Sequence, residues 1–308
     1  MLDFRTRTFL TVCKYMNYTK AAEKLCITQP AVSQHIKFLE TDYKAKLFYY
    51  EGKKLALTPA GELFYKKLST IAYDDQTLRK RMLQDNKSIM HLNFGATRTI
   101  GEFYLADKLT QFLNENPSMQ LSLIIENTAY LLDKLQRGEI DFALLEGYFP
   151  KSEYSFLPYA REEYICVATP DYPFKQTPHL LEDLLTERLI IREKGSGTRA
   201  ILEKNLENQN FVLSDFKQLI EIGNIHVLKK LVINNLGITT LYKTAVTQEL
   251  ADNQLCRIEI EDLQKTHDFY FVWRKDSVFS DLYKQIVHFF RKFSYTKKAK
   301  KRQYFFAF

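Results

Sequence analysis

The alternation of apolar and polar residues divides this 308-residue chain into three stretches. In residues 1–40, apolar residues recur every three or four positions, which is the period of amphipathic helices. After a short interruption, the same period continues without a helix-breaking residue to about Asn86. From Ser88 onward, short apolar runs alternate with helical segments, which favours a parallel sheet with right-handed crossovers. The pattern therefore predicts a small helical module, one long helix and an α/β region.

Residues 18–40 have the pattern of a helix-turn-helix. Thr19 is a good N-cap for a short helix over 20–26, and Ile27 is expected to fill the turn that follows. Thr28 then caps a second helix, which has a proline in its first turn, where the missing N–H costs nothing. An ordinary helical hairpin is the alternative interpretation.

The second helix has two faces of different chemistry. Val32, Ile36 and Leu39 recur at i, i+4 and i+7, so they are expected to be buried. Another face carries amides, hydroxyls and a lysine but almost no carboxylates, which suits contact with base edges and phosphates. We therefore expect this helix to be the recognition helix. Together with two lysines of the next hairpin, the residues expected to bind DNA are Thr28, Gln29, Pro30, Ser33, Gln34, Lys37, Lys53 and Lys54.

A hairpin and a long helix follow. The strands expected over 47–50 and 54–57 form a wing. Thr58 then caps the long helix, whose apolar residues are spaced like an a/d seam. A seam on a single helix needs a partner, so we expect homodimerisation through it; packing on its own wing domain is the alternative. The residues of this predicted seam are Phe64, Leu68, Ile71, Leu78 and Met82.

The α/β region is expected to form two lobes. Residues 88–161 have the order strand, helix, strand, helix, strand, and a similar set follows over 162–265. A strand and a helix over 266–293 resemble elements that return to complete the first sheet. The predicted fold class is α/β with an N-terminal all-α winged helix-turn-helix, a long linker helix and two doubly wound effector lobes. The predicted domains are residues 1–58, 59–87, 88–161 with 266–293, 162–265, and a basic, aromatic tail over 294–308.

The net charge of +7 is unevenly distributed. Residues 1–58 carry a net charge of +5 and residues 291–308 carry +7, whereas residues 87–290 carry −6. Nucleic acid should therefore meet the N-terminal module rather than the acidic α/β region. For the tail, two interpretations stay open: it adds DNA affinity and docks its aromatic residues on a neighbouring subunit, or it is a solvated, partly disordered end.

Further patterns predict a cytoplasmic protein. No run approaches the roughly 18 apolar residues of a membrane span. The first 16 residues have the pattern of an amphipathic helix rather than of a secretion signal. The four cysteines, at positions 13, 26, 166 and 256, lack metal-ligand spacing. We expect reduced thiols, no membrane contact, no metal and no cofactor.

Motifs along nearly the whole chain resemble the LysR-type transcriptional regulator family. The N-terminal motifs are specific, and the later ones are weak singly but stand in the family's order. The resemblance implies a homodimer or homotetramer that binds promoter double-stranded DNA through winged helix-turn-helix pairs. It also implies a small effector held between two periplasmic-binding-protein-like lobes. The motifs are FLTV (9–12), AAEKL (21–25), TQPAVSQHI (28–36), LE (39–40), LF (47–48), LTPAG (57–61), GEIDFAL (138–144), GSGTR (195–199) and LVINNLGI (231–238).

The chain departs from the family pattern at two places and lacks a cysteine found in one group of relatives. The usual leucine–glycine pair after the recognition helix is Tyr43-Lys44 here. Either Lys44 takes a left-handed conformation, at about 1 kcal/mol, or the helix continues. The usual arginine of the wing is Tyr50, which calls that phosphate contact into question. Peroxide-sensing relatives carry a reactive cysteine near GSGTR, but residues 195–210 contain none, so we expect no thiol switch of that kind.

The resemblance places the effector between the two lobes. Two segments, Thr97–Thr99 and Ser196–Thr198, supply hydroxyls and backbone N–H groups at helix N-termini, which favours an anion. Ser and Thr also cap helices of every kind, and the acidic net charge of this region together with Glu146 would favour a cation. We expect a small anion. The effector-binding residues implied are Thr97, Arg98, Thr99, Thr128, Glu146, Ser196, Gly197, Thr198, Arg199 and Asn224.

Other functional classes fit the sequence less well. GSGTR is too short for a dinucleotide fingerprint and lacks the lysine of a P-loop. The six histidines are scattered, and no nucleophile–base pair is visible, so we do not expect an enzyme. A solute-binding protein would explain the lobes but not residues 1–86. The alternatives are a winged-helix repressor without a ligand, or an enzyme or solute-binding domain fused to a DNA-binding module.

Overall fold

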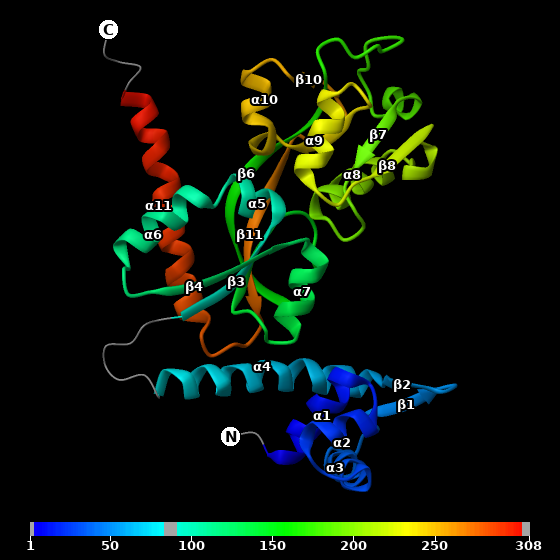
Figure 1. Ribbon diagram of the computed structural model, residues 1–308, viewed down its shortest axis with the longest axis vertical. Helices are drawn as coiled ribbons and strands as arrows, with labels where there is room; N and C mark the ends of the chain where they lie inside the picture. Colours follow the sequence, from blue (N-terminus) through cyan, green and yellow to red (C-terminus); the bar gives the residue numbers. More distant parts are fainter. Residues whose placement is uncertain (1–2, 83–90, 304–308) are drawn as a thin grey trace. The chain divides into compact units, whose positions relative to one another are not determined.

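The computed structural model describes residues 3–82 and 91–303, so Asn86 and the last five residues of the predicted tail lie outside the described ranges. The chain forms two compact units (Figure 1). Most of the first consists of the N-terminal helices and the hairpin, and most of the second consists of the α/β region. None of the helices in these ranges is long and apolar enough to cross a membrane.

The N-terminal unit is a winged helix-turn-helix followed by a long helix. Its core is built from the three short helices, with Val32, Ile36 and Leu39 of the predicted stripe all buried. Phe9 and Val12 of the first helix pack against that stripe. The elements are α1 (Phe4–Tyr15), α2 (Tyr18–Leu25), α3 (Gln29–Asp42), β1 (Phe48–Glu51), β2 (Lys54–Leu57) and α4 (Pro59–Met82).

The start of α2 and the turn after it differ from the prediction. Asn17 rather than Thr19 is the N-cap, because its side chain accepts a hydrogen bond from the backbone N–H of Lys20 at 2.9 Å. Ile27 is 36% exposed and does not fill the turn. Backbone hydrogen bonds close the turn instead, with Cys26 in the left-handed conformation, so no apolar residue is needed there.

The end of α3 decides between the two conformations expected at Lys44. Its φ is +51°, so the residue takes the left-handed conformation and the helix stops. The backbone N–H groups of Lys44 and Ala45 donate to the carbonyls of Thr41 and Glu40 at 3.3 and 3.0 Å. These bonds satisfy two of the terminal carbonyls of the helix.

The larger of the two sheets in the α/β unit has seven strands and extends through both lobes. Its strand order is β10-β6-β11-β5-β3-β4, and β9 also pairs with β6. β3 lies parallel to β4 and β5, and β11 is antiparallel to β5 and β6. The strands of this sheet are β3 (His91–Thr97), β4 (Gln120–Glu126), β5 (Phe142–Leu145), β6 (Tyr154–Ala168), β9 (Thr239–Tyr242), β10 (Cys256–Ile258) and β11 (Thr266–Arg274).

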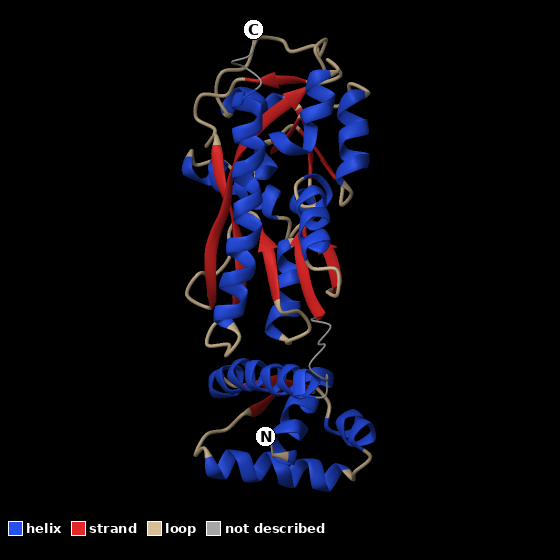
Figure 2. Cartoon of the chain, turned by 90° about the vertical axis from the view of Figure 1, so that its left-hand side faces the viewer, coloured by secondary structure: helices blue, strands red, loops and turns tan. Residues whose placement is uncertain are grey.

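We call the part around β3, β4 and β5 the first lobe, and the part around β7 (Arg188–Ile191), β8 (Gln218–Glu221), β9 and β10 the second lobe. β7 and β8 are parallel, and a parallel bridge joins Leu189 to Ile238 beside β9. Helices flank the strands of both lobes (Figures 1 and 2). The helices of this unit are α5 (Arg98–Phe103), α6 (Ala106–Glu115), α7 (Thr128–Gln136), α8 (Gly197–Asn208), α9 (Ile225–Ile233), α10 (Thr247–Ala251) and α11 (Ser280–Gln303), with short 3-10 helices η1 (Glu182–Thr186), η2 (Leu213–Asp215) and η3 (Lys243–Val246).

Two elements, β6 and α11, are longer than the sequence pattern predicts. The sequence predicts a strand only near 164–168, but β6 begins at Tyr154 and passes from one lobe to the other beside β11 (Figure 1). Pro158 and three charged residues, 161–163, interrupt the apolar pattern in its first half and hide the strand. α11 continues to Gln303, beyond the predicted end at Phe293, because no proline or glycine stops it.

Candidate DNA-binding surface and interlobe site

The exposed face of α3 carries the residues predicted to read DNA. Gln34 and Lys37 are exposed, and Ser33 is half-buried. The side-chain amide of Gln29 donates to the Ser33 hydroxyl at 3.0 Å, which orients both polar groups. Thr28 accepts a hydrogen bond from the backbone N–H of Ala31, so its side chain serves as the N-cap of the helix.

The wing adds a second basic, aromatic surface. Lys53 and Lys54 are exposed at the turn between β1 and β2, where Gly52 takes the positive φ that the turn requires. Tyr50, in the place of the family's arginine, is also exposed. Its phenol keeps one hydrogen-bond donor for a phosphate but no positive charge.

The predicted seam of α4 divides into two parts. Leu68 is buried in the core of the N-terminal unit, and the Phe64 ring lies 5.0 Å from that of Phe9. These two residues therefore pack against their own domain, which was the alternative interpretation of the seam. The later seam residues stay exposed: Ile71 at 53%, Leu78 at 50% and Met82 at 77%. Heptad spacing alone does not distinguish the two kinds of contact, because both require the same apolar face.

Glu146 lies at the centre of the interlobe site. It directly follows β5, is only 2% exposed, and receives hydrogen bonds from both lobes. The hydroxyl of Thr99 donates to its Oε1 atom at 3.1 Å from the first lobe, and that of Thr198 donates to the same atom at 2.9 Å from the second. The Thr128 hydroxyl donates to its backbone carbonyl at 3.2 Å. The side chain therefore joins the two lobes.

The topology explains why these residues meet. β3, β4 and β5 are parallel neighbours, so their carboxyl ends lie along one edge of the sheet. Thr97, Glu126 and Glu146 stand at or just after those ends. β7 ends likewise in the second lobe, and the residues after it lead into the first turn of α8. The site thus forms where the strand ends of the two lobes face each other.

Two glycines bring the backbones of the lobes into contact. A Cβ atom on Gly197 would lie 2.4 Å from the carbonyl oxygen of Glu146, and one on Gly147 would lie 2.7 Å from the Cα atom of Gly197. Gly147 also has a φ of +77°, which other residues rarely adopt. The backbones of the two lobes therefore touch beside Glu146.

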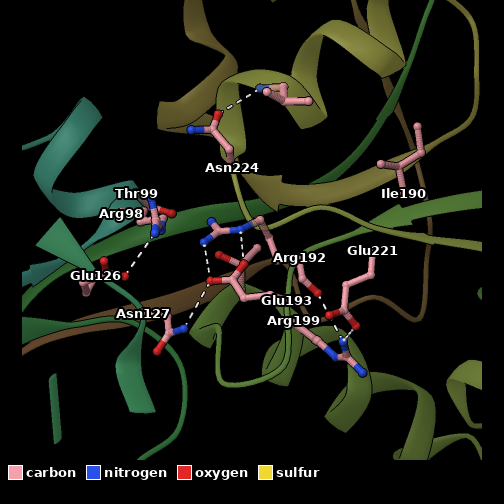
Figure 3. A network of polar contacts seen from close by, with 12 residues as sticks. Arg98, Thr99, Glu126, Asn127, Ile190, Arg192, Glu193, Arg199, Glu221 and Asn224 are labelled. Carbon is pink, nitrogen blue, oxygen red and sulfur yellow. Dashed lines mark hydrogen bonds and ion pairs between the residues drawn. The ribbon is translucent and has the colours of Figure 1, made fainter. Parts of the chain in front are cut away.

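A network that the sequence reasoning missed is centred on Arg192 and Glu193 (Figure 3), and the charge of Arg192 acts on Glu146. Arg192, which is 3% exposed, donates from Nε and Nη2 to the Glu193 carboxylate at 2.9 and 3.1 Å. The Asn127 amide of the first lobe donates to that carboxylate at 3.3 Å. The signal for Arg192 was its position directly after a buried strand, at the carboxyl end where parallel sheets bind ligands.

Other predicted residues have partners elsewhere. Arg199 pairs with Glu203 and Glu221, and Arg98 pairs with Glu126 at 3.0 Å (Figure 3). Asn224 caps α9 by accepting the backbone N–H groups of His226 and Val227. Ser196 is the N-cap residue of α8, but its side chain makes no capping hydrogen bond.

Several buried polar atoms of the interlobe site have no hydrogen-bond partner within the described ranges. Two are nitrogen atoms of arginine side chains, one is a threonine hydroxyl, one is a carboxylate oxygen and one is a tyrosine hydroxyl. These atoms are Thr97 Oγ1, Arg98 Nε, Arg192 Nη1, Glu146 Oε2 and Tyr242 Oη. Leaving such a group unpaired costs about 1–3 kcal/mol, so the site contains a concentration of unsatisfied polar atoms.

Burial determines the electrostatics of this site. It raises the pKa of the Glu146 carboxyl, and the Thr198 and Thr99 hydroxyls, the Arg192 charge and the Thr97 hydroxyl oppose that rise only in part. Burial also raises the pKa of the Tyr242 phenol, and the charge of Glu146 adds to that effect. A carboxyl group that is buried, and not paired directly with a cation, favours its neutral form.

Family models match both parts of the chain. The bacterial regulatory helix-turn-helix model of the lysR family matches residues 5–62, and the LysR substrate binding domain model matches residues 87–294. The chain belongs to the LysR family. This LysR-type protein is therefore a helix-turn-helix transcriptional regulator with a substrate-binding domain.

Individual relatives and solved structures agree with this assignment. The LysR-type chain is 29% identical over 259 residues to the HTH-type transcriptional regulator CysL of Bacillus subtilis, covering 83% of this chain and 85% of CysL. Its fold is similar to that of full-length LysG from Corynebacterium glutamicum with bound effector Arg, with a TM-score of 0.66, 16% identity, and coverage of 95% and 99%. A full-length OxyR variant from Pseudomonas aeruginosa gives a TM-score of 0.62, 20% identity, and coverage of 94% and 95%.

Proposed function

We propose that this LysR-type regulator responds to a small oxoanion held between its two lobes. In this proposal it binds promoter DNA in the cytoplasm as a homodimer or homotetramer and catalyses no reaction. The observation that carries the anion is the surplus of unpaired, buried donors in the interlobe site. Thr97 Oγ1, Arg98 Nε and Arg192 Nη1 all lack a partner within the described ranges.

The start of α8 supports an anion independently. This helix has 12 residues, and the side chain of its N-cap residue, Ser196, leaves the first backbone N–H groups uncapped. A helix N-terminus carries roughly half a positive charge, which partly offsets the desolvation of an anion. Ser196 is itself buried next to Gly197, the residue that touches the first lobe.

Two features favour a cation, and we judge them weaker. The net charge of −6 on residues 87–290 is spread over a large surface, and salt screens it over about 10 Å. Glu146 lies within the site, but two threonine hydroxyls already hydrogen-bond to its Oε1 atom. The bound effector of LysG, Arg, makes a cationic amino acid the competing ligand class to test.

For DNA binding, we propose that Gln29, Ser33, Gln34 and Lys37 of α3 enter the major groove and that Lys53 and Lys54 of the wing contact phosphates. The support is the exposure of this face opposite the buried stripe of the same helix. For assembly, we propose that the exposed apolar residues of α4, Ile71, Leu78 and Met82, contact a second copy of the chain.

A thermal-shift screen tests the anion. Sulfate, inorganic phosphate and acetate are compared with arginine on the full-length protein, and binding of an anion should raise the melting temperature. Thr97→Val keeps the shape of the side chain but removes the unpaired hydroxyl, so it should weaken binding of that anion by about tenfold or more. Thr198→Val is a poorer test, because that hydroxyl already donates to Glu146.

The control for Thr97→Val is Thr110→Val on α6, whose hydroxyl donates only to the carbonyl of Ala106. That variant should leave anion binding unchanged. Neither variant should alter a DNA mobility shift measured without effector. If arginine alone raises the melting temperature, and Thr97→Val leaves that rise unchanged, the proposal of an anion is wrong.

A further inference from the structure

Glu146 places a carboxyl group where the proposed function requires donors. Its two oxygen atoms have different surroundings. Oε1 accepts two hydroxyl hydrogen bonds, one from Thr99 and one from Thr198. Oε2 is buried and accepts no well-formed hydrogen bond within the described ranges, although the Thr97 hydroxyl lies close enough to the carboxyl group to lower its pKa slightly. An ionised carboxylate would leave a buried, partly charged oxygen unpaired there, which is the costly arrangement.

Protonation removes this conflict. In a neutral carboxyl group, the oxygen that receives two hydrogen bonds acts as the carbonyl oxygen, and the other oxygen carries the proton. Oε1 would then keep both threonine donors, and Oε2 would become an O–H donor. The unpaired atoms of Thr97, Arg98, Arg192 and Glu146 named around the site would then all be hydrogen-bond donors.

The groups that face Glu146 fit this arrangement. Arg192, after β7, is the charged group whose field reaches the carboxyl, and Glu193 partly neutralises it through two hydrogen bonds. Tyr164 of β6 and Tyr242 of β9 are buried phenols whose pKa is raised well above its ordinary value, so both stay neutral. The Tyr164 hydroxyl is within hydrogen-bonding distance of Thr198 and Thr240. Glu146 is thus the group in this set whose pKa burial raises from an ordinary value of 4.5, so its protonation is the one that a bound anion can favour.

We propose that Glu146 is neutral when the effector is bound and donates a hydrogen bond from Oε2 to the anion, so that each anion binds together with one proton from solvent. This inference rests on the proposed anion. It makes the regulator respond to pH as well as to effector concentration, because acidification favours the form that binds. The proton adds to Oε2, and no other bond forms or breaks.

The test measures the affinity of the full-length protein for sulfate by isothermal titration calorimetry from about pH 5 to about pH 8, a range in which sulfate itself does not titrate. Uptake of one proton should weaken binding by up to about tenfold for each unit of rising pH. Titrations in two buffers with different ionisation enthalpies should count close to one proton taken up per sulfate bound.

Glu146→Gln is the decisive variant. Its amide oxygen still accepts from Thr99 and Thr198, and its NH2 group donates at every pH in place of Oε2. We expect Glu146→Gln to bind sulfate with an affinity that no longer depends on pH and without proton uptake. Glu207→Gln, at an exposed position of α8, is the matched control and should keep the wild-type dependence on pH.

Stability gives a second measurement with a defined sign. The folded state binds the Glu146 proton more tightly than the unfolded state, whose pKa is near 4.5. Above that value the unfolded chain loses the proton first, so the contribution of Glu146 to stability falls as pH rises toward the folded pKa. Without ligand, Glu146→Gln should remove this part of the decline in melting temperature with pH.

The outcomes separate this inference from the proposed function. If wild-type protein binds sulfate equally well at every pH, or if Glu146→Gln keeps the pH dependence, the proton-linked role of Glu146 is wrong and the anion site stands. Loss of all sulfate binding in Glu146→Gln would mean that an ionised carboxylate is required, which also overturns the inference. If neither sulfate nor phosphate stabilises either protein, the anion proposal fails and this inference fails with it.

Discussion

The core of the N-terminal unit and the interlobe site are both well packed, but their contacts span very different distances along the chain. The core of the N-terminal unit joins residues of the consecutive helices α1, α2 and α3, together with Leu68 of α4. The interlobe site joins Thr99, Glu146 and Thr198, which come from three segments and two lobes. In the first region the helical period decides which residues meet, whereas in the second the sheet topology decides it.

The largest expected effect comes from substitutions on α4, which compare the buried part of the predicted seam with its exposed part. Leu68→Asp places a carboxylate in the buried core of the N-terminal unit, which should cost about 3–5 kcal/mol and unfold that unit. Leu78→Asp places the same group at a position that is half exposed in the isolated chain, so the unit should stay folded. Circular dichroism and thermal melts of both variants measure whether the N-terminal unit stays folded.

Sedimentation of the same pair then tests assembly. Leu78→Asp should yield smaller species and much weaker binding to an operator with two half-sites, because the proposed helix–helix contact would bury an unpaired charge. A Leu78→Asp protein that keeps its mass and its operator affinity would exclude this face from the interface. A well-folded Leu68→Asp protein would contradict the burial of Leu68 in the core.

The seam and the interlobe site together show what the sequence can predict. The stripe of Val32, Ile36 and Leu39 was predictable because all its members lie on one helix, where spacing fixes the face. Thr97, Glu146 and Thr198 were predictable only through the family resemblance, since no local pattern joins them. Arg192 and the first half of β6 were missed, because charged residues at a strand end and within a strand have no period of their own. Leu68 was assigned to the dimer seam, but its side chain is buried in the core of its own unit, because an apolar face does not specify what covers it.

The backbone contact between the lobes provides the next test. Gly197→Ala would put a Cβ atom 2.4 Å from the backbone carbonyl oxygen of Glu146, so the lobes must separate. Overpacking of this kind costs about 1–3 kcal/mol, and it should abolish stabilisation by the anion. Gly223→Ala is the matched control, because its nearest atom, in Glu193, lies 3.9 Å away. Equal melting temperatures and equal anion binding for both variants would show that the lobes tolerate separation.

The recognition helix should show a comparable effect on DNA binding alone. Replacing Ser33 or Gln34 by alanine should cost about 1–3 kcal/mol of specific affinity and relax the base preference, because each removes a polar group from the exposed face. Lys37→Ala should weaken binding to all sequences alike and flatten its dependence on salt, as expected for a phosphate contact. Footprints at several salt concentrations check all three, and unchanged footprints would remove α3 from the groove.

The smallest expected effect concerns Lys44, where the chain departs from the family's glycine. Its left-handed conformation, with φ at +51°, costs a lysine about 1 kcal/mol, and a glycine adopts it without that strain. Glycine also raises the entropy of the unfolded chain, which offsets part of the gain. Lys44→Gly should therefore stabilise the N-terminal unit by roughly 0.5 kcal/mol. Lys20→Gly, in the first turn of α2, makes the same chemical change at a helical position and should destabilise the unit by up to about 1 kcal/mol. Denaturant melts of the two variants should shift in opposite directions. A Lys44→Gly melt that shifts toward lower denaturant, as the Lys20→Gly melt does, would mean that the lysine side chain makes a favourable contact larger than the backbone strain.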